Sequence, residues 1–321
     1  MKKKSGLEYI GKFGTYMIVL FLLIAGCLVS DKFLSLTNLV NILDAVSYLG
    51  ILASGMALVT YCGQSVDLST PSTIAVASFV SVLTLKFGMF PMLFCTLASG
   101  VLIGALNGLV IGKFRINTVV WTLAMSFVFA GLIRVVFGSA NIYPKEGNVE
   151  LFEQISRYRV FGFIPLGVIV MVLLMAVLHI FISRSRIGRQ FKLVGCSEEV
   201  AKYSGINVLK IIVLSFVGSG IAAAVTGLFI ASLSISACYN YGTGYEFRAI
   251  TAVVLSGMVL DGGRGSIAGV FGGVLAIGLL NNIMTLLGLN SFLQNVVTGI
   301  VFIVIVWFTN YTTKKLEALN G

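Results

Sequence analysis

The sequence predicts an all-α polytopic membrane protein with about ten transmembrane helices. Of its 321 residues, 58% carry hydrophobic side chains and 11% are charged, and the mean hydropathy is +1.02. A soluble globule needs more polar side chains than this to cover its surface. Long apolar runs recur along the chain, and about 20 helical residues cross a bilayer core. The short alternating segments of a β-barrel are absent. We therefore expect one transmembrane domain over residues 1–321.

Ten apolar segments, each flanked by polar or basic residues, are predicted to be the membrane helices. In chain order they are 14–30, 37–61, 72–85, 90–111, 118–137, 163–182, 210–233, 249–260, 266–286 and 292–309. The third and the eighth segments are short for a full crossing. Each of these two is expected to be tilted, broken or re-entrant.

Basic residues gather in alternate connecting segments. If the N-terminus is inside, fifteen of the 22 lysines and arginines are cytoplasmic, namely Lys2, Lys3, Lys4, Lys12, Lys113, Arg115, Arg184, Arg186, Arg189, Lys192, Lys202, Lys210, Arg264, Lys314 and Lys315. The outer segments hold only Lys32, Lys86, Lys145, Arg157 and Arg159. The positive-inside rule therefore predicts that both termini are cytoplasmic. The net charge of +10 does not gather on a soluble face, so no nucleic-acid partner is predicted.

The connecting segment 183–209 has the sequence pattern of a short capped helix. Ser197 fits the N-cap position, Glu198 and Glu199 fit the first turn, and Gly205 fits the C-terminal end. Because this segment lies inside, the helix is expected to be a docking element for a cytoplasmic partner. A second long segment, between the fifth and sixth helices, lies outside and either contacts a soluble partner or only connects two helices.

An internal echo indicates an inverted repeat. The run 100–107 (GVLIGALN) reappears as 273–281 (GVLAIGLLN) with one residue inserted, and in the predicted topology the two copies cross the membrane in opposite senses. Glycine-rich helix faces also recur by chance. Solute pathways commonly lie between such repeats near the bilayer midplane, so Asn107, Asn281 and Asn282 are expected to face a pathway. Hydrogen bonding between helices is the alternative, because an amide exposed to lipid is costly.

Neither a catalytic nor a metal site is predicted. His179 is the only histidine and has no metal-binding partner at helical spacing, and the five cysteines show neither zinc-ligand nor paired spacing. No Gly-x-x-x-x-Gly-Lys-Ser/Thr run is present, so ATP is not expected to be hydrolysed by this chain. We expect no cofactor and no enzyme activity.

Two further stretches depart from plain apolar helix. In 63–69 (GQSVDLS), Asp67 and Ser69 precede the third helix, and their oxygens are expected either to cap that helix or to line a solute path. In 242–257 (GTGYEFRAITAVVLSG), Glu246 lies at the start of a helix that begins with glycines, and the run Gly-Gly-Arg-Gly-Ser follows. A charge so close to lipid is costly unless it is paired or faces water.

With the run 185–189 (SRIGR) before the capped helix, these stretches resemble the permease subunits of sugar ATP-binding-cassette (ABC) importers, the ribose, xylose and galactoside group. The matching family patterns are Gly-Gly-x-Asp-Leu-Ser, Arg-x-Gly-Arg followed by Ser-Gly-Ile, and Gly-x-Gly-x-Glu-Leu-x-Ala-Ile. Gln64 and Phe247 replace a Gly and a Leu of these patterns. The resemblance covers nearly the whole chain.

The resemblance implies a permease subunit that provides the path for a small polar solute, expected to be a monosaccharide, across the cytoplasmic membrane. It implies three partners: an ABC ATPase subunit on the cytoplasmic face, an extracytoplasmic solute-binding protein, and a second copy of this chain or a related permease. The predicted ATPase-coupling residues are Ser197, Glu198, Glu199, Val200, Ala201, Lys202, Tyr203 and Gly205, with Val200, Ala201 and Tyr203 on the exposed face. The expected translocation path comprises Asp67, Ser69, Asn107, Glu246, Asn281 and Asn282. The alternative is an ion-gradient-driven secondary transporter with Asp44, Asp67 or Arg134 as coupling charges.

Overall fold

The computed structural model describes residues 6–320, so Lys2, Lys3 and Lys4, which contribute to the predicted orientation, lie outside the described residues. The described chain is almost entirely helical, with one short antiparallel hairpin. Its elements are α1 (Gly6–Val29), α2 (Leu36–Tyr61), α3 (Thr70–Thr84), the 3-10 helix η1 (Leu85–Phe87), α4 (Met89–Phe114), α5 (Thr118–Phe137), α6 (Val149–Arg157), β1 (Arg159–Val160), β2 (Ile164–Pro165), α7 (Leu166–Arg184), α8 (Arg186–Cys196), α9 (Glu198–Tyr203), α10 (Val208–Ser234), α11 (Tyr245–Leu255), α12 (Ile267–Leu286) and α13 (Ser291–Asn320).

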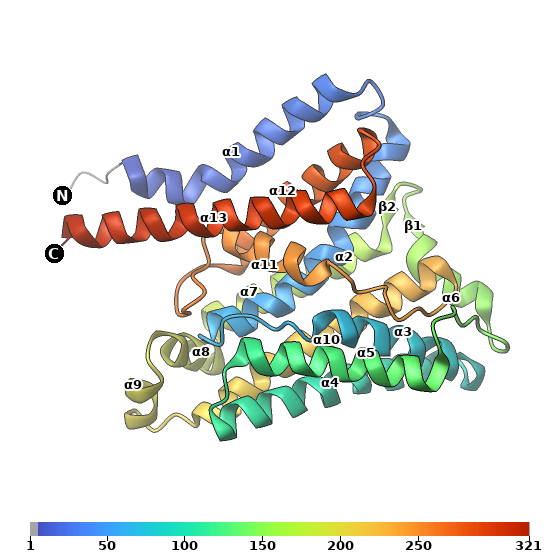
Figure 1. Cartoon of the computed structure of the whole chain (residues 1–321), viewed down its shortest axis with the longest axis horizontal. Coiled ribbons are helices and arrows are strands. Elements are labelled where there is room, and N and C mark those ends of the chain that lie inside the picture. The colour runs from blue at the N-terminus through green and yellow to red at the C-terminus, as the bar shows by residue number, and fades with distance from the viewer. Residues whose placement is uncertain (1–5, 321) are drawn as a thin grey trace.

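The all-α prediction is confirmed, and a helix forms at each of the ten predicted segments (Figure 1). Within the described residues, seven helices are long and apolar enough to cross a membrane: α2, α3 with η1, α4, α5, α7, α10 and α12. The apolar parts of α1 and α13 are shorter. The eighth segment, predicted as 249–260, forms the short helix α11 instead, because the chain turns after Ser256 through Gly257 at φ +82°.

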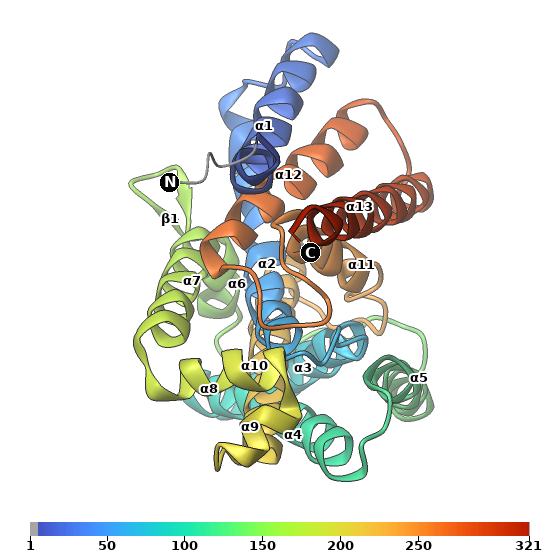
Figure 2. The same ribbon diagram turned by 90° about the vertical axis from the view of Figure 1, so that its left-hand side faces the viewer.

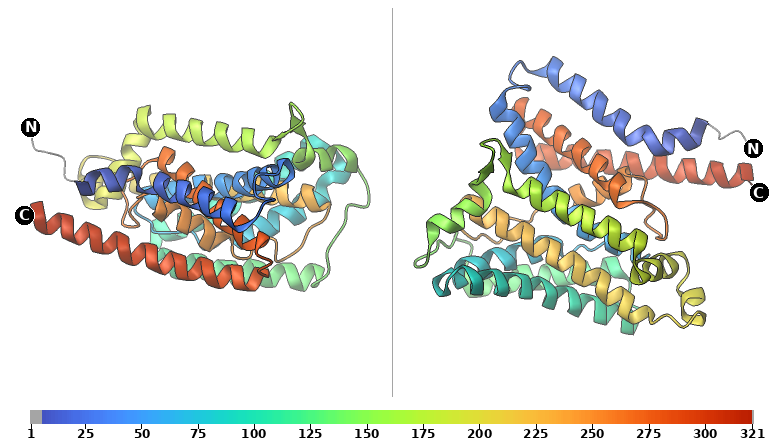
Figure 3. Two further views of the ribbon diagram at one scale, coloured as in Figure 1. Left: turned by 90° about the horizontal axis from the view of Figure 1, so that it is seen from above. Right: turned by 180° about the vertical axis from the view of Figure 1, so that it is seen from behind.

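The helices form a bundle in which α2 and α10 run through the centre (Figure 2). Figure 3 shows α7 and α13 on opposite faces of this bundle. Small residues allow close helix contact. A Cβ atom on Gly100 of α4 would overlap the Gly220 carbonyl of α10, and one on Gly104 would overlap the backbone at Phe216. The glycines of the first copy of the echo therefore pack α4 directly onto α10.

The bundle has two distinct ends, which we name by their elements. The α9 end carries α8 and α9, and α1 begins and α13 ends on the same side of the molecule (Figure 1). The hairpin end carries α6, β1 and β2 (Figure 1). Since α1 begins and α13 ends at the same end, the chain crosses the bundle an even number of times.

The contacts between helices repeat in two halves. In the first half, α4 packs on α10 and α3 contacts α4 and α5; in the second, α12 packs on α2 and α11 contacts α12 and α13. The same correspondence holds for the shorter helices, because α3 packs on the central helix α10 and α11 packs on the central helix α2. The helices α2 and α10 run in opposite directions between the two ends (Figure 1). Two inverted repeats would produce this set of contacts.

Candidate functional site

Asp67 is the centre of a buried hydrogen-bond network toward the α9 end. Its side chain is 2% exposed. One carboxylate oxygen accepts from the backbone N–H and the hydroxyl of Ser69, at 3.0 and 2.6 Å, and the other accepts from Ser219 of α10 at 2.8 Å. Asn107 of α4 donates to the Ser69 hydroxyl at 2.8 Å and accepts from the indole N–H of Trp121 at 3.0 Å. The network therefore joins the loop before α3 to α4, α5 and α10.

The expectation that Asp67 and Ser69 cap α3 is wrong. Ser69 occupies the N-cap position but its side chain accepts no backbone N–H of the helix, and the nearest backbone donor to Asp67 is Ser69 itself. Both side chains point instead into the network. A carboxylate without water needs several donors, and Ser69 and Ser219 supply them here.

The other predicted path residues lie toward the hairpin end. Asn282 of α12 exchanges two hydrogen bonds with Asn38 of α2, at 2.8 and 3.1 Å. The neighbouring Asn281 donates to the Ile277 carbonyl of its own helix at 2.9 Å. Glu246 lies partly buried in the first turn of α11. The structure thus separates the six predicted residues into two groups at opposite halves of the bundle.

The predicted coupling helix is present as α9. The Ser197 side chain accepts the Val200 N–H, which confirms the predicted N-cap, and Gly205 follows the helix at φ +77°, as a C-terminal glycine does. Glu198 forms an ion pair with Arg115 at the end of α4 and accepts from the Gln64 amide at 2.8 Å. The first turn of α9 is therefore fixed to the α9 ends of α2 and α4.

The prediction that Ala201 lies on the exposed face of this helix is wrong. Its side chain is 0% exposed and belongs to the main hydrophobic core. Val200 and Tyr203, by contrast, are 56% and 91% exposed, and Glu199 and Lys202 are exposed as well. The carboxylate of Glu198 is paired with Arg115 and Gln64 of the same chain. The free surface of α9 is thus formed by two apolar side chains and two opposite charges.

A family model supports the interpretation of these motifs. The model described as the permease component of branched-chain amino acid transport systems matches residues 38–306. The chain belongs to this family. It is 32% identical to the ribose import permease protein RbsC of Haemophilus influenzae, over 98% of this chain and 100% of the relative. It is 35% identical to RbsC of Bacillus subtilis, over 92% and 91% of the two chains. The L-arabinose transport system permease protein AraH of Escherichia coli is 30% identical, over 94% and 92%. No solved structure matches the chain.

The SRIGR motif of this permease extends into a helix, α8, that was not predicted from the sequence. Residues of the SRIGR run form the start of α8, which Ser185 caps by accepting the Gly188 N–H at 2.8 Å. Phe191 and Val194 are buried, at 1% and 2% exposure, while Lys192 is exposed. The spacing of Ile187, Phe191 and Val194 is the signal that could have predicted this amphipathic helix.

Glycines connect the end of α8 to two of the other motifs. The backbone N–H of Gly263 donates to the Tyr61 carbonyl at 3.0 Å, and Gly195 lies against both. Gly63 and Gly262 adopt φ of +78° and +92° and approach the same point. Because a side chain would overlap backbone atoms here, only glycine allows these segments to meet. We call Gly63, Gly195, Gly262 and Gly263 the glycine node.

One ion pair was not foreseen. Asp44 of α2 accepts from Arg159 of β1 at 2.7 Å, and both side chains are mostly buried. The two residues are 115 positions apart, so the sequence carried no signal for their contact. Within the described chain, no three His, Cys, Asp or Glu side chains lie together as metal ligands would.

Proposed function

We propose that this chain is the transmembrane permease subunit of an ABC importer that carries a monosaccharide across the cytoplasmic membrane. The observation that carries the proposal is the α9 helix. It is anchored to the bundle by Glu198, and the side chains of Val200 and Tyr203 are exposed on its surface. A monosaccharide is the expected solute because relatives that match over most of this chain are named ribose and L-arabinose permeases.

The orientation follows from the same helix. The ABC ATPase subunit binds α9, so the α9 end and both termini are cytoplasmic. The exposed surface of α9 combines apolar contact with one charge of each sign, which favours a specific protein interface. The extracytoplasmic solute-binding protein then docks at the hairpin end, and a second copy of this chain or a related permease completes the complex.

The path for the solute lies between the two halves of the bundle. Asp67, Ser69 and Asn107 contribute from one half, and Glu246, Asn281 and Asn282 contribute from the other. All six are polar groups inside the bundle, two in the loop before α3 and four on α4, α11 and α12, and such groups are costly in a membrane unless they are paired or face a water-filled path.

Ion-gradient-driven transport is the second candidate, and the acids do not favour it. Asp44 is paired with Arg159, and Asp67 already accepts three hydrogen bonds. Uptake into vesicles that contain the complex should require ATP and the ATPase subunit and should be indifferent to ionophores. Uptake that ionophores abolish without ATP would support the secondary transporter instead.

The variant Val200→Arg tests the role of α9. A large charged side chain at this exposed position should block docking by steric overlap, while the bundle, which Val200 barely contacts, still inserts. We expect normal membrane abundance with loss of uptake and of ATPase co-purification. Tyr143→Arg, at an exposed position between α5 and α6, is the matched control and should retain the ATPase. Normal uptake by Val200→Arg would contradict the proposal.

A further inference from the structure

Five buried side-chain atoms in the described residues have no hydrogen-bond partner. They are one carboxylate oxygen each of Asp44 and Glu246, the Tyr48 hydroxyl, the Arg248 Nε and the Asn281 amide oxygen. Tyr48 is 4% exposed, and its hydroxyl forms no hydrogen bond of normal geometry although Ser156 is nearby. Ser156 uses its own hydroxyl to donate to the Phe229 carbonyl at 2.5 Å. Buried polar atoms are rarely left unpaired, so a group of them requires an explanation.

All five atoms lie on α2, α11 and α12, which contact one another pairwise. Two close approaches fix the relative depth of these helices. A Cβ atom on Gly278 of α12 would overlap Val46 of α2, and one on Gly273 would overlap the Ala252 carbonyl of α11. Counting outward from these points along antiparallel helices, all five residues fall within roughly 8 Å of depth, because a helix rises about 1.5 Å per residue.

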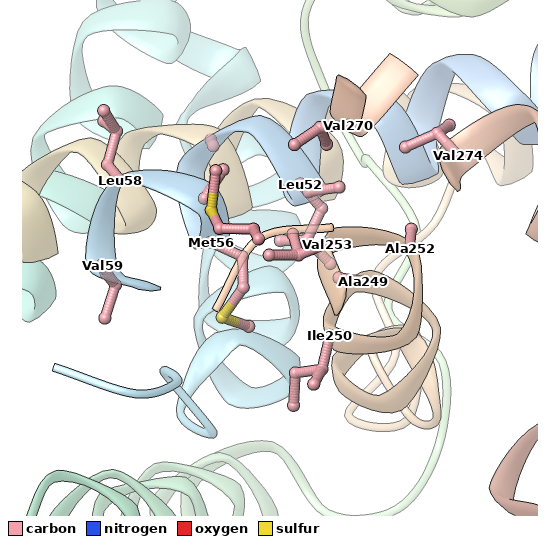
Figure 4. Close-up of a cluster of buried hydrophobic side chains, with 14 of the residues drawn as sticks. Leu52, Met56, Leu58, Val59, Ala249, Ile250, Ala252, Val253, Val270 and Val274 are labelled. Atoms are coloured by element: carbon pink, nitrogen blue, oxygen red, sulfur yellow. The ribbon is translucent and has the colours of Figure 1, made fainter. Parts of the chain in front are cut away.

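The helix faces also converge. Figure 4 shows Leu52 and Met56 of α2 beside Ala249, Ile250 and Val253 of α11 in the apolar core. Asp44 and Tyr48 continue the same face of α2 toward the hairpin end at four-residue spacing. Glu246 continues the packed face of α11 in the same direction, one turn before Ile250. Tyr48 also contacts Phe229 of α10, and Asp44 is paired with Arg159 of β1, so these groups lie at a similar depth on the hairpin side of this core.

The two halves of the bundle differ at equivalent places. Asn107 and Asn281 occupy the same position in the two copies of the echo, three residues after Gly104 and Gly278. The amide oxygen of Asn107 has a partner, but that of Asn281 has none. In the same way Asp67 has partners for both carboxylate oxygens, whereas one oxygen of Glu246 has none. In the first half the protein itself supplies hydrogen-bond partners for these polar atoms, whereas in the second half the unpaired atoms are available to a ligand.

The unpaired atoms define the chemistry of what binds. Three are acceptors on carboxylate or amide groups, the tyrosine hydroxyl donates or accepts, and the arginine nitrogen donates. The hydroxyl groups of a ligand can donate to these acceptors and accept from these donors. Arg159 pairs with Asp44, and Arg248 is two residues from Glu246 in α11, so the formal charges of these four side chains sum to zero and an anionic solute gains nothing from them. Tyr48 also packs on Phe229, with ring centroids 5.6 Å apart, so its ring is held in place and its hydroxyl is the group left for a ligand.

We propose that Asp44, Tyr48, Glu246 and Asn281 form a solute-contact site for a neutral, hydroxyl-rich molecule near the hairpin end of the bundle. This proposal rests on the proposed function, because it assumes that the chain carries a solute. It adds the position of a contact site, the atoms that form it and the exclusion of acidic or phosphorylated solutes. Arg159 holds Asp44 so that one of its carboxylate oxygens remains available.

The test compares Tyr48→Phe, Glu246→Gln and Asp44→Asn in vesicles that contain the permease, its ATPase and its binding protein. D-Ribose and L-arabinose are the probes. Tyr48→Phe removes a hydroxyl, and Glu246→Gln and Asp44→Asn replace one carboxylate oxygen with an NH2 group that cannot accept a hydrogen bond. Each variant therefore weakens one contact with the solute, and uptake per ATP hydrolysed should fall by about fivefold. ATPase stimulation by the loaded binding protein should stay within about twofold, because α9 is untouched. Tyr16→Phe, at an exposed position on α1, is the matched control and should behave as the unmodified chain.

Three results would overturn the proposal. Unchanged uptake per ATP in Tyr48→Phe and Glu246→Gln would show that these atoms do not touch the solute. A parallel fall in uptake, ATPase stimulation and complex yield would show a structural role only. ATP-independent uptake, or no uptake of either sugar by the unmodified complex, would overturn the proposed function together with this site. If Asp44→Asn fails to accumulate because Arg159 loses its charged partner, the other two variants decide the question.

Discussion

At Asp67 a single carboxylate organises a polar network within an apolar bundle. Each of its oxygens accepts a hydroxyl, and the Ser69 hydroxyl in turn accepts from Asn107. Charge-assisted hydrogen bonds are stronger than neutral ones, and removing their acceptor leaves buried donors without a partner. The network therefore stabilises the loop that connects α2 to α3.

We predict that Asp67→Ala destabilises the chain by about 3 kcal/mol, because the Ser69 N–H and the hydroxyls of Ser69 and Ser219 lose their common acceptor. Thermal unfolding of the purified chain in detergent should show a clearly lower midpoint. Asp31→Ala, in the exposed turn between α1 and α2, is the control and should leave the midpoint unchanged. Equal midpoints for the two variants would show that the network contributes nothing.

The sequence singled out several polar residues as site candidates but not always their contacts. Asp67, Ser69 and Asn107 stand out as polar groups among apolar ones, so each could be predicted individually. Their mutual contact could not, because it depends on how α4 packs against the loop before α3. The burial of Ala201 was missed for the same reason. A six-residue helix turns a different side chain inward for each angle at which it meets the bundle, and its sequence does not specify that angle.

Among the elements, α8 and α9 with the glycine node connect the segment 183–209 to the bundle. Gln64 and Arg115 hold the start of α9, and the glycine node holds the end of α8 against the α9 end of α2. The run 262–266, which follows α11, joins at the same place. We therefore expect a displacement of α9 to be passed to segments that precede α3 and follow α11.

We predict that Gly195→Ala abolishes most ATP-dependent uptake and reduces stability by about 1–3 kcal/mol, because the new methyl group would overlap the Tyr61 carbonyl and the Gly263 backbone. Uptake and membrane abundance are measured together. Gly131→Ala, in α5, meets no atom within 4 Å and should leave both quantities unchanged. The coupling role of the glycine node is refuted if Gly195→Ala transports as well as Gly131→Ala.

Apolar length predicted the membrane helices well and the amphipathic ones poorly. The segment 118–137 coincides with α5, since charged or polar residues flank a long apolar run. The helices α6 and α8 were both assigned to connecting segments, because their polar faces lower the mean hydropathy. Asn148 and Ser185 cap them, and these caps together with the helical spacing of Phe152 and Phe191 were the available signals.

At the scale of the whole molecule, the chain is expected to work as a pair. It carries one α9 helix, whereas an ATPase dimer offers two equivalent grooves. Native mass spectrometry of the complex purified through its ATPase should show two permease chains of 34.3 kDa each, or one with a related permease. A stable, active complex that contains a single permease chain would contradict this expectation.

The inverted halves of the bundle lead to a prediction about access. Asn107 is 0% exposed and fully paired, whereas Asn281 is partly exposed with an unpaired oxygen. In a background without Cys27, Cys62, Cys95, Cys196 and Cys238, we predict that Asn281→Cys reacts with a water-soluble thiol reagent about tenfold faster than Asn107→Cys, which corresponds to about 1.4 kcal/mol of differential opening. Trapping the ATPase with nucleotide and vanadate should reverse this order, since inverted repeats exchange conformations when access alternates. Ser78→Cys, buried in α3, should stay unreactive in both states. If neither asparagine position reacts in either state, both amides serve only to bond helices together, and the path between the halves must be sought elsewhere.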